Sequence, residues 1–585
     1  MSKLPSLKSV ISATQKTISR FPLETLTAIC GTVFAIIWEQ KKYGEPQEFY
    51  MKAVMSCSLC LVLFLSLSLY FQVSKKNNLL RFLSSLILGS LLVAFVFSFK
   101  KRITDVEIQQ FIVLNIALHL LVSFAGFLPK KYNQEEFWEF NKQLFLRILT
   151  SGLYSIVFYC GLALAILAIE KLFNFDFYNH IYAHVFIFIA GVFNTIFFLN
   201  GVPAIDKEST LDLSYPKGLK NFTQFVLLPL ISLYLVILIC YEAKILITLS
   251  LPVGWVSYLV LVFAIFGILS FLLIHPIANE NSNLWMKNFN RWFYFLLVPL
   301  LVLLFWAILY RINIYGFTHE RYYVLLLSVW LSVVVICFLI QKHPKIKFIP
   351  ISMCLAGLFS IVGPQSADSV SKHCQLSRFE SYIQKIDNTK LTFEQQKDLS
   401  SIVSFLEDNY GIECMVPLAK NKLDKLYKSN KLASDYEIMQ ALGYEFKSRY
   451  ANTNSTNEIY YSYYENEDNN VQNIHGYDLS FNISSYNDLN CVDCTKIENK
   501  SYSIKSTKKD YGVDLKINED IIALKFIDFI NSNPAFLDDR SEKITQSIKT
   551  DKYDILITFF NVNGNIEKKK KIINNYQIKV MMAVK

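Results

Sequence analysis

Charged residues are scarce in this 585-residue chain: Asp, Glu, Lys and Arg together make up 18% of it, against about 25% in typical soluble proteins. Hydrophobic residues make up 53% and aromatic residues 15%. A soluble chain of this length does not carry so much apolar side chain with so little charge. The composition therefore excludes a wholly soluble protein and favours one that works in a membrane.

The chain also lacks the short motifs of the commonest catalytic sites. No phosphate-binding P-loop, dinucleotide fingerprint, Gly-x-Ser-x-Gly elbow or His-Glu-x-x-His pair occurs, so a recognisable ATPase, serine hydrolase or zinc protease is not expected. No basic stripe interleaved with stacking aromatics lies in a soluble segment, so no nucleic-acid partner is predicted. The sequence predicts no catalytic residue, no cofactor and no metal site.

Apolar stretches of spanning length follow one another between residues 21 and 363. A helix needs roughly 20 mostly apolar residues to cross the hydrocarbon core, and about eleven stretches approach this length. The predicted spans are 21–38, 50–72, 79–99, 106–128, 146–170, 181–200, 222–249, 253–277, 292–310, 322–340 and 347–363. The last contains Pro350 in its first turn and is the least regular. We expect an α-helical polytopic membrane domain over residues 21–363.

Lysine and arginine in the loops predict the orientation of these spans. Residues 1–364 hold 29 Lys and Arg against 17 Asp and Glu, whereas the rest of the chain holds 29 against 31. The N-terminal segment and the alternate loops on its side carry 19 cations, and the opposite loops carry 10. Because cytoplasmic loops are enriched in Lys and Arg, residues 1–20 are predicted to be cytoplasmic. Eleven crossings then put the C-terminal domain outside, which for a bacterial inner membrane is the periplasm.

Residues 364–585 are polar and are predicted to form an α+β soluble domain. Apolar residues recur at helical spacing to about residue 450, and Thr392 with Gln395 three residues later is typical of a helix N-terminus. Beyond that point the pattern predicts strands of a mainly antiparallel sheet. The two last strands flank Asn563-Gly564, a dipeptide typical of hairpin turns.

The densest polar cluster lies between the ninth and tenth predicted spans. On the predicted topology it faces outside, together with Lys244 and the turn that ends in Trp255. Three cations near the outer interface could bind an anionic headgroup or a lipid-linked phosphate. The alternative is a helix-linking turn with interfacial Tyr and Arg anchors. The candidate ligand-binding residues are Lys244, Trp255, Arg311, Tyr315, His319, Glu320 and Arg321.

Few other ionisable residues lie at membrane depth. Asn115 and His119, one turn apart in the fourth span, share a helix face and form either an interhelical hydrogen bond or part of a proton relay. Glu24 in the first span is expected to extend to the interface, and Glu242 lies in the seventh span. No buried chain of carboxylates is evident, which disfavours a proton- or sodium-coupled pump.

Four of the eleven cysteines lie in the soluble part. Cys491 and Cys494 are the close pair among them. A zinc site would need two further ligands at metal spacing, and a reactive thiol would be favoured at a helix start. The pair is expected to form a structural disulfide if the domain faces an oxidising compartment, or to have no special role.

Several segments of the membrane half resemble one family. They are Phe137-Trp138-Glu139-Phe140-Asn141 with Leu144–Arg147, Pro229-Leu230, Lys244 with Pro252-Val253-Gly254-Trp255, and Tyr315–Thr318 with Arg321-Tyr322-Tyr323. The first also suits an amphipathic helix in the cytoplasmic interface. In these segments the chain resembles the bacterial membrane proteins labelled domain of unknown function forty-one fifty-three. The resemblance implies a polytopic inner-membrane protein with an appended domain, and it implies no catalytic residue.

The sequence leaves three functions open. The first is binding or transport of an anionic or lipid-linked envelope compound at an outer-leaflet site. The second is a membrane-anchored sensor or scaffold whose outer domain binds an envelope partner through a sheet edge. The third is a membrane enzyme acting on a lipid-linked precursor, although no nucleophile–base pair stands out. Membrane lipids are the partners common to all three, and the oligomeric state stays open.

Overall fold

The computed structural model describes most of the chain in two compact units. The described residues are 7–41, 47–74, 77–100, 103–129, 131, 133–175, 177, 180–205, 217–248, 255–274, 284–341, 344–386, 389–428, 433–448, 459–464, 474–486, 489–497, 500–533, 536, 543–567 and 570–585. The first unit, Met1–Ser448, is the helical unit, and the second, Arg449–Lys585, is the strand unit. Each is described by itself.

The helical unit contains the predicted spans. Its α-helices are α1 (Leu7–Arg20), α2 (Pro22–Gln40), α3 (Glu48–Ser74), α4 (Asn78–Phe97), α5 (Asp105–Ala125), α6 (Gln134–Phe173), α7 (Ile181–Phe188), α8 (Asn194–Asn200), α9 (Lys217–Phe222), α10 (Leu228–Thr248), α11 (Trp255–Ile274), α12 (Leu284–Tyr315), α13 (His319–Ile340), α14 (Phe348–Ile361), α15 (Ala367–Ile386), α16 (Phe393–Tyr410), α17 (Asp424–Lys428) and α18 (Asp435–Ala441). Two π-helical turns, η1 (Ile189–Phe193) and η2 (Thr223–Leu227), join α7 to α8 and α9 to α10.

The predicted polytopic helical domain is confirmed. Among the described residues, nine helices are long and apolar enough to cross a membrane. Two shorter apolar helices, Tyr258–Ser270 within α11 and Phe348–Ile361, fall on the eighth and eleventh predicted spans. The count therefore lies close to the expected eleven.

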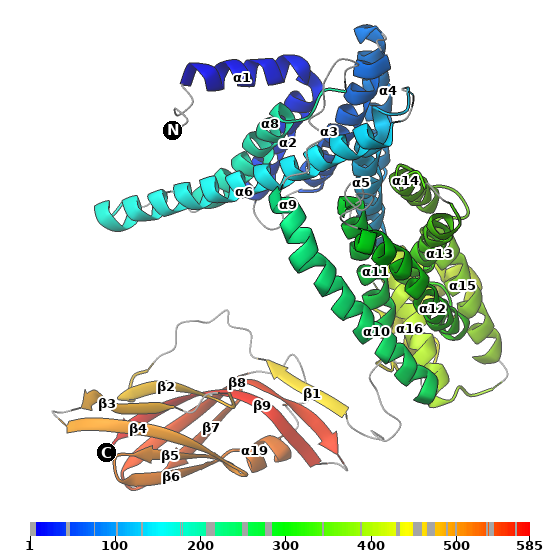
Figure 1. The fold of residues 1–585 in the computed structure, drawn as a ribbon. Helices are drawn as coiled ribbons and strands as arrows, with labels where there is room; N and C mark the ends of the chain where they lie inside the picture. The colour runs from blue at the N-terminus through cyan, green and yellow to red at the C-terminus, as the bar shows by residue number, and fades with distance from the viewer. Residues whose placement is uncertain are drawn as a thin grey trace. The chain divides into compact units, whose positions relative to one another are not determined.

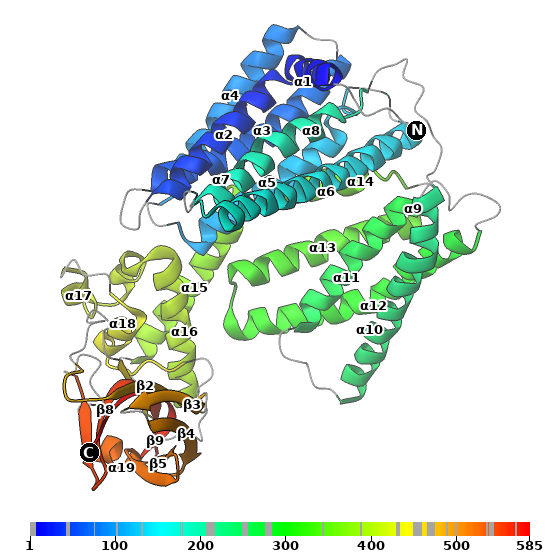
Figure 2. The ribbon, with the colours of Figure 1, turned by 90° about the vertical axis from the view of Figure 1, so that its left-hand side faces the viewer.

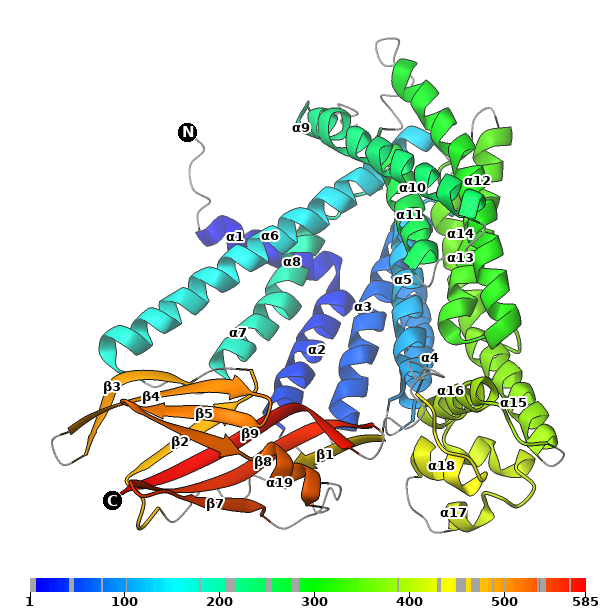
Figure 3. The same cartoon turned by 90° about the horizontal axis from the view of Figure 1, so that it is seen from below.

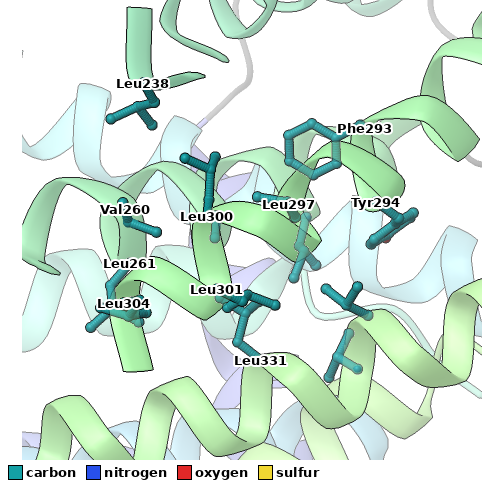
Figure 4. Packing of buried hydrophobic residues seen from close by; sticks show 14 of the residues in the cluster. Leu238, Val260, Leu261, Phe293, Tyr294, Leu297, Leu300, Leu301, Leu304 and Leu331 are labelled. Carbon is teal, nitrogen blue, oxygen red and sulfur yellow. The ribbon is translucent and has the colours of Figure 1, made fainter. Parts of the chain in front are cut away.

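The spanning helices pack their buried residues into two clusters. One joins α3–α5, the start of α6, α8 and α14, and contains Leu59 and Leu118. The other joins α10–α13, and Figure 4 shows Leu297, Leu300 and Leu304 of α12 within it. Figure 2 shows the two groups of helices, coloured mainly blue and green. Many large apolar side chains outside the clusters are exposed, which suits contact with lipid tails that are themselves apolar.

The helix α6 is one continuous helix of 40 residues, seen in cyan in Figure 3. The interpretation of its first turns as a separate amphipathic helix at the interface is wrong, because Phe137, Trp138 and Phe140 are buried in the first cluster. Trp138 Nε1 donates a hydrogen bond of 2.7 Å to the carbonyl oxygen of Leu272 in α11. Trp138 thus links the first group of helices to the second.

Four helices that follow the last span belong to the helical unit. The helices α15–α18 surround their own buried cluster, which includes Phe379, Leu399 and Leu406, and we call residues 367–448 the helical cap. Thr392 and Gln395 form the predicted capping box at the start of α16. The sequence suggests a boundary at residue 364, where the apolar spans end. The compact units divide instead at 448/449, because the cap packs against the spanning helices.

The strand unit consists of antiparallel strands and one short helix. Its elements are β1 (Ile459–Tyr464), β2 (Leu479–Ser484), β3 (Asn490–Ile497), β4 (Lys500–Lys509), β5 (Gly512–Ile517), β6 (Asp520–Lys525), α19 (Ile527–Ser532), β7 (Thr545–Lys549), β8 (Tyr553–Glu567) and β9 (Lys570–Val584). One sheet has the order β1-β8-β9-β2 with β7 paired to β8, and the other has the order β3-β4-β5-β6, as Figure 1 shows. Both contribute to one core, for example with Tyr463, Leu515 and Ile557. The predicted strand-rich C-terminal domain is confirmed.

The strands β8 and β9 form the predicted hairpin, but the turn is not at Asn563-Gly564. The strand β8 continues through this dipeptide, and Glu567 still pairs with Lys570 of β9. The register shifts between Asn563 and Gly564, as it does at a β-bulge. The dipeptide therefore marks an irregularity within the ladder rather than its end.

Replacing Trp138 by Phe is expected to destabilise the helical unit by about 1–2 kcal/mol, because it leaves the Leu272 carbonyl without its side-chain donor. The matched control is Trp292→Phe, since Trp292 is 61% exposed. Thermal unfolding of the full chain in detergent measures both. Equal midpoints for the two variants would show that the Trp138 bond does not join the helix groups.

Candidate functional site

The turn between α12 and α13 is where the spanning helices meet the cap. Gly316 in this turn has a φ of 71°, which glycine adopts without steric cost. A Cβ atom at this position would lie 2.8 Å from Cδ of Arg378 and 3.0 Å from Sγ of Cys374. The close approach of α15 therefore requires glycine as much as the backbone conformation does.

Two side chains of α15 hold the backbone of this turn. Gln375, which is buried, donates hydrogen bonds to the carbonyl oxygens of Tyr315 (3.1 Å) and Phe317 (2.7 Å). Arg378 donates to the Tyr315 carbonyl as well and pairs with Asp398 of α16 at 2.6 Å. The last carbonyl groups of a helix have no partner within it, so these bonds cap α12 and attach α15 and α16 to it.

Several predicted ligand-binding residues gather around the same turn. Arg321 donates to a turn carbonyl at 2.9 Å, and its guanidinium lies 5.3 Å from the ring centre of Tyr315. Glu320 accepts a hydrogen bond of 3.4 Å from the hydroxyl of Tyr258 in α11, and Arg311 interacts electrostatically with the same tyrosine. The charged groups are thus brought together, and protein groups engage each of them.

The structure does not join Lys244 and Trp255 to this group. Lys244 in α10 is exposed, and no contact between described side chains links it to the α12–α13 turn. Trp255 begins α11, but its side chain lies outside the described residues. The structure therefore brings together only some of the predicted ligand-binding residues.

His319 lies in a buried polar cluster between the membrane helices and the cap. It is 4% exposed and stacks on Phe405, with ring centres 5.3 Å apart. Its Nε2 lies 3.1 Å from the hydroxyl oxygen of Tyr410 and 3.7 Å from Oδ1 of Asp368. The Tyr410 hydroxyl donates to the same Oδ1 at 2.8 Å. These three residues, which we call the polar triad, connect α13, α15 and α16.

Two lysines flank the ring of Tyr410. Nζ of Lys372 lies 4.9 Å and Nζ of Lys100 lies 5.7 Å from the ring centre, within the range of cation–π attraction. Lys100 also donates a 2.7 Å hydrogen bond to the carbonyl oxygen of Asn409. Because Lys100 lies between α4 and α5, the cap contacts both groups of spanning helices.

The electrostatics of the triad favour an ionised Asp368. Burial by itself raises the pKa of this carboxyl, but the hydrogen bonds from His319 and Tyr410, with the positive charges of His319 and Lys372, outweigh burial and lower it. Burial raises the pKa of Tyr410, and the neighbouring Asp368 charge raises it further. The tyrosine is therefore the hydrogen-bond donor and the aspartate the acceptor at neutral pH.

Sequence reasoning missed the cap residues of this site. Asp368, Ser371, Gln375 and Arg378 recur at intervals of three and four along α15. This spacing places polar groups on one face of a helix, and it was the available signal for a docking face. Nothing local marks Tyr410, because it reaches the triad from a different helix.

Asn115 and His119 lie together on α5. The Asn115 side chain donates to the hydroxyl of Ser58 in α3 at 3.1 Å, an interhelical hydrogen bond of the kind that the structural alternative requires. Nδ1 of His119 lies 2.8 Å from the Asn115 carbonyl oxygen. The described contacts of His119 are therefore local to its own helix.

The expected position of Glu24 at the interface is wrong. Its side chain is completely buried, accepts a hydrogen bond from the Ser68 hydroxyl, and lies 3.7 Å from Nη2 of Arg81. A partnered carboxylate of this kind can stay buried because a cation and a donor replace water.

Cys491 in β3 is disulfide-bonded. The side chain of Cys494 lies outside the described residues, so the pairing of these two cysteines stays a prediction. Within the described ranges, no group of three or more His, Cys, Asp or Glu side chains is arranged to hold a metal ion.

The fold and the site define a polytopic membrane protein with a cap docked on the turn between two of its spans. The chain belongs to the family described as Domain of unknown function (DUF4153), whose model matches residues 58–389. The matched segment includes most of α3, the spans that follow it, the α12–α13 turn and all of α15. Asp368, Gln375 and Arg378 therefore lie inside the matched segment, whereas their partners Asp398 and Tyr410 lie beyond it.

The chain is also similar to the uncharacterized protein PM1469 of Pasteurella multocida (strain Pm70). The two are 26% identical over 266 residues, which cover 45% of this chain and 43% of that protein. The chain thus matches less than half the length of this relative. No solved structure matches the chain.

Replacing Tyr410 by Phe is expected to destabilise the cap by about 2 kcal/mol, because the Asp368 carboxylate and His319 lose the hydroxyl between them. Tyr427→Phe is the matched control, since Tyr427 lies on α17 of the cap and is 46% exposed. Limited proteolysis of the cap in the full chain measures the opening of each variant. Equal protection of the two would contradict a stabilising role for the triad.

The stability of the cap is expected to fall in acid through Asp368. Because the folded-state pKa lies below the unfolded value of about 3.9, the carboxylate contributes stability above that value and loses it as the pH falls through the lowered pKa. Asp368→Asn should be less stable than the unaltered protein at pH 7, and the difference should shrink towards pH 3. A difference that is independent of pH would contradict this account. Proteolytic protection measured across this range tests it.

Proposed function

We propose that the protein is a membrane-anchored sensor or scaffold of a bacterial inner membrane. The observation that carries the proposal is the attachment of the cap to both groups of spanning helices, through Gln375 and Arg378 to the end of α12 and through Lys100 to α16. Because the cap is attached to the membrane helices, a movement of these helices also moves the cap and the strand unit that follows it in the chain. The strand unit, which continues the chain, then serves to bind a protein or envelope partner.

The proposed orientation has the N-terminus in the cytoplasm and the cap and strand unit in the periplasm. Loop charges support it. The cap contacts the α4–α5 loop at Lys100 and the α12–α13 turn at Tyr315, and both face outward in an eleven-span arrangement. The disulfide at Cys491 suits an oxidising compartment.

Binding of an anionic or lipid-linked envelope compound is the second candidate. The observation in its favour is the gathering of Arg311 and Arg321 near Tyr258 and Glu320. Arg321 is already engaged by a turn carbonyl and by Tyr315, which makes this the weaker candidate. A membrane enzyme would need a nucleophile–base pair in an open site, and His319 of the polar triad is only 4% exposed.

The test places a photo-crosslinking amino acid at Val492 of the full chain in its own membrane. Val492 is 62% exposed on β3, an outer strand of the four-stranded sheet, where a partner could add a strand. We expect one discrete cross-linked product that is absent when the probe replaces the exposed Tyr427 of the cap. If Val492 gives no product and the double variant Arg311→Gln, Arg321→Gln abolishes binding of anionic lipid vesicles, the second candidate replaces the first.

A further inference from the structure

The buried face of α10 contains a single ionisable residue. The residues buried along this helix are Leu228, Ile231, Leu235, Leu238, Glu242 and Ile245. Their intervals of three and four residues define one continuous stripe of a helix. Figure 4 shows Leu238 of this stripe with Val260 and Leu261 of α11. Glu242 lies one turn beyond Leu238, so it occupies a core position rather than a position facing lipid or water.

Glu242 is buried without a polar partner among the described residues. Its side chain is 8% exposed, and no hydrogen bond or ion pair joins it to any described group. Lys244 follows two residues later, but a separation of two residues puts it on the opposite side of the helix, where it is exposed. Glu242 is thus an isolated carboxyl group at membrane depth.

The neighbouring helices offer Glu242 no counter-charge that the structure describes. The elements packed against α10 are η2, α11 and α12. The titratable and charged side chains described on α9, α10, α11 and α12 are Lys220, Tyr234, Cys240, Tyr241, Lys244, Tyr258, Arg291, Tyr294, Tyr310, Arg311 and Tyr315. None of them interacts with Glu242. Its environment is therefore apolar on every described side.

Glu24 provides a direct comparison within the same membrane domain. It is more deeply buried than Glu242, yet it has the Ser68 hydroxyl and the Arg81 guanidinium beside it. Partners of this kind stabilise a carboxylate anion, whereas an isolated anion in apolar surroundings is so unfavourable that the group takes up a proton. The two glutamates therefore differ in their polar surroundings, since only Glu24 has a donor and a cation beside it.

We propose that Glu242 is a proton-binding site of the membrane domain. The carboxyl group carries its proton while α10 is packed against α11 and α12. It releases the proton when the packing opens and water can solvate the anion. An ionisable residue held in this way inside a membrane domain commonly couples a proton to a change in helix packing. The site is separate from the cap and from the function proposed for it.

Carbodiimide labelling tests this site in the full-length protein reconstituted in lipid vesicles. Dicyclohexylcarbodiimide reacts with protonated carboxyl groups in apolar surroundings: the carboxyl oxygen bonds to the central carbon, and the proton moves to a carbodiimide nitrogen. We expect Glu242, located by mass spectrometry, to be labelled at neutral pH, and the rate of labelling to fall as the pH rises. No labelling of Glu242, or a rate that does not change with pH, overturns the proposal.

Two isosteric variants separate proton binding from a structural role. Glu242→Gln keeps the shape and the neutral state, so labelling should disappear while the midpoint of thermal unfolding stays the same or rises. Glu24→Gln removes a charged partner of Arg81, so it should lower the midpoint and leave the labelling of Glu242 intact. If Glu242→Gln lowers the midpoint as much as Glu24→Gln does, Glu242 is an ionised structural residue and the proposal is wrong.

Discussion

The backbone carbonyl groups at the end of α12 are the constraint on which the arrangement of the helical unit depends. A helix leaves its last carbonyls without partners, and here Gln375 and Arg378 of α15 supply donors to Tyr315 and its neighbours. Gly316 permits the close approach, because a Cβ atom would overlap Arg378. The ion pair of Arg378 with Asp398 then brings α16 into the same contact. One pair of side chains therefore decides where the cap lies.

This constraint explains why polar groups of the charged segment 311–323 are engaged by other groups of the protein. Its arginines, tyrosines and histidine are used to finish one helix, start the next and hold the cap. The polar triad extends the attachment to α13, and Lys100 extends it to the other group of spanning helices. The family match ends at residue 389, just after α15, so the family includes the helix that makes the docking contacts.

The sequence predicted the parts of the fold that depend on local composition. Apolar length revealed the spans, and alternation with capping chemistry revealed the sheets and the start of α16. The sequence did not predict that the cap belongs to the helical unit. Hydropathy marks where spans end, but it carries no information about what packs on their ends. The turn predicted at Asn563-Gly564 was wrong for a similar reason. The long pairing of β8 with β9 overrode the local turn preference of this dipeptide. The candidate residues from Arg311 to Arg321 could be predicted because they lie close together in the sequence. Asp368 and Tyr410 come near this segment only through tertiary packing, so the sequence did not reveal them.

The two glutamates in the spanning helices also show that the sequence alone does not reveal which groups surround a side chain. Both are visible in the sequence as charges inside apolar spans. Only the structure separates the partnered Glu24 from the isolated Glu242, since Arg81 and Ser68 come from other helices. A carboxyl group in a membrane domain takes its chemical role from its neighbours, and those neighbours are distant in the chain.

The proposal that depends most on orientation is that the docked cap lies at the outer ends of the spanning helices, on the side opposite the N-terminus. The most direct measurement fuses either a periplasm-active or a cytoplasm-active reporter after residue 365, with the same reporters at the N-terminus as controls. The account predicts that only the periplasm-active reporter works after residue 365 and only the cytoplasm-active one at the N-terminus. Activity of the same reporter at both positions would contradict it, because the cap would then lie on the N-terminal side of the membrane.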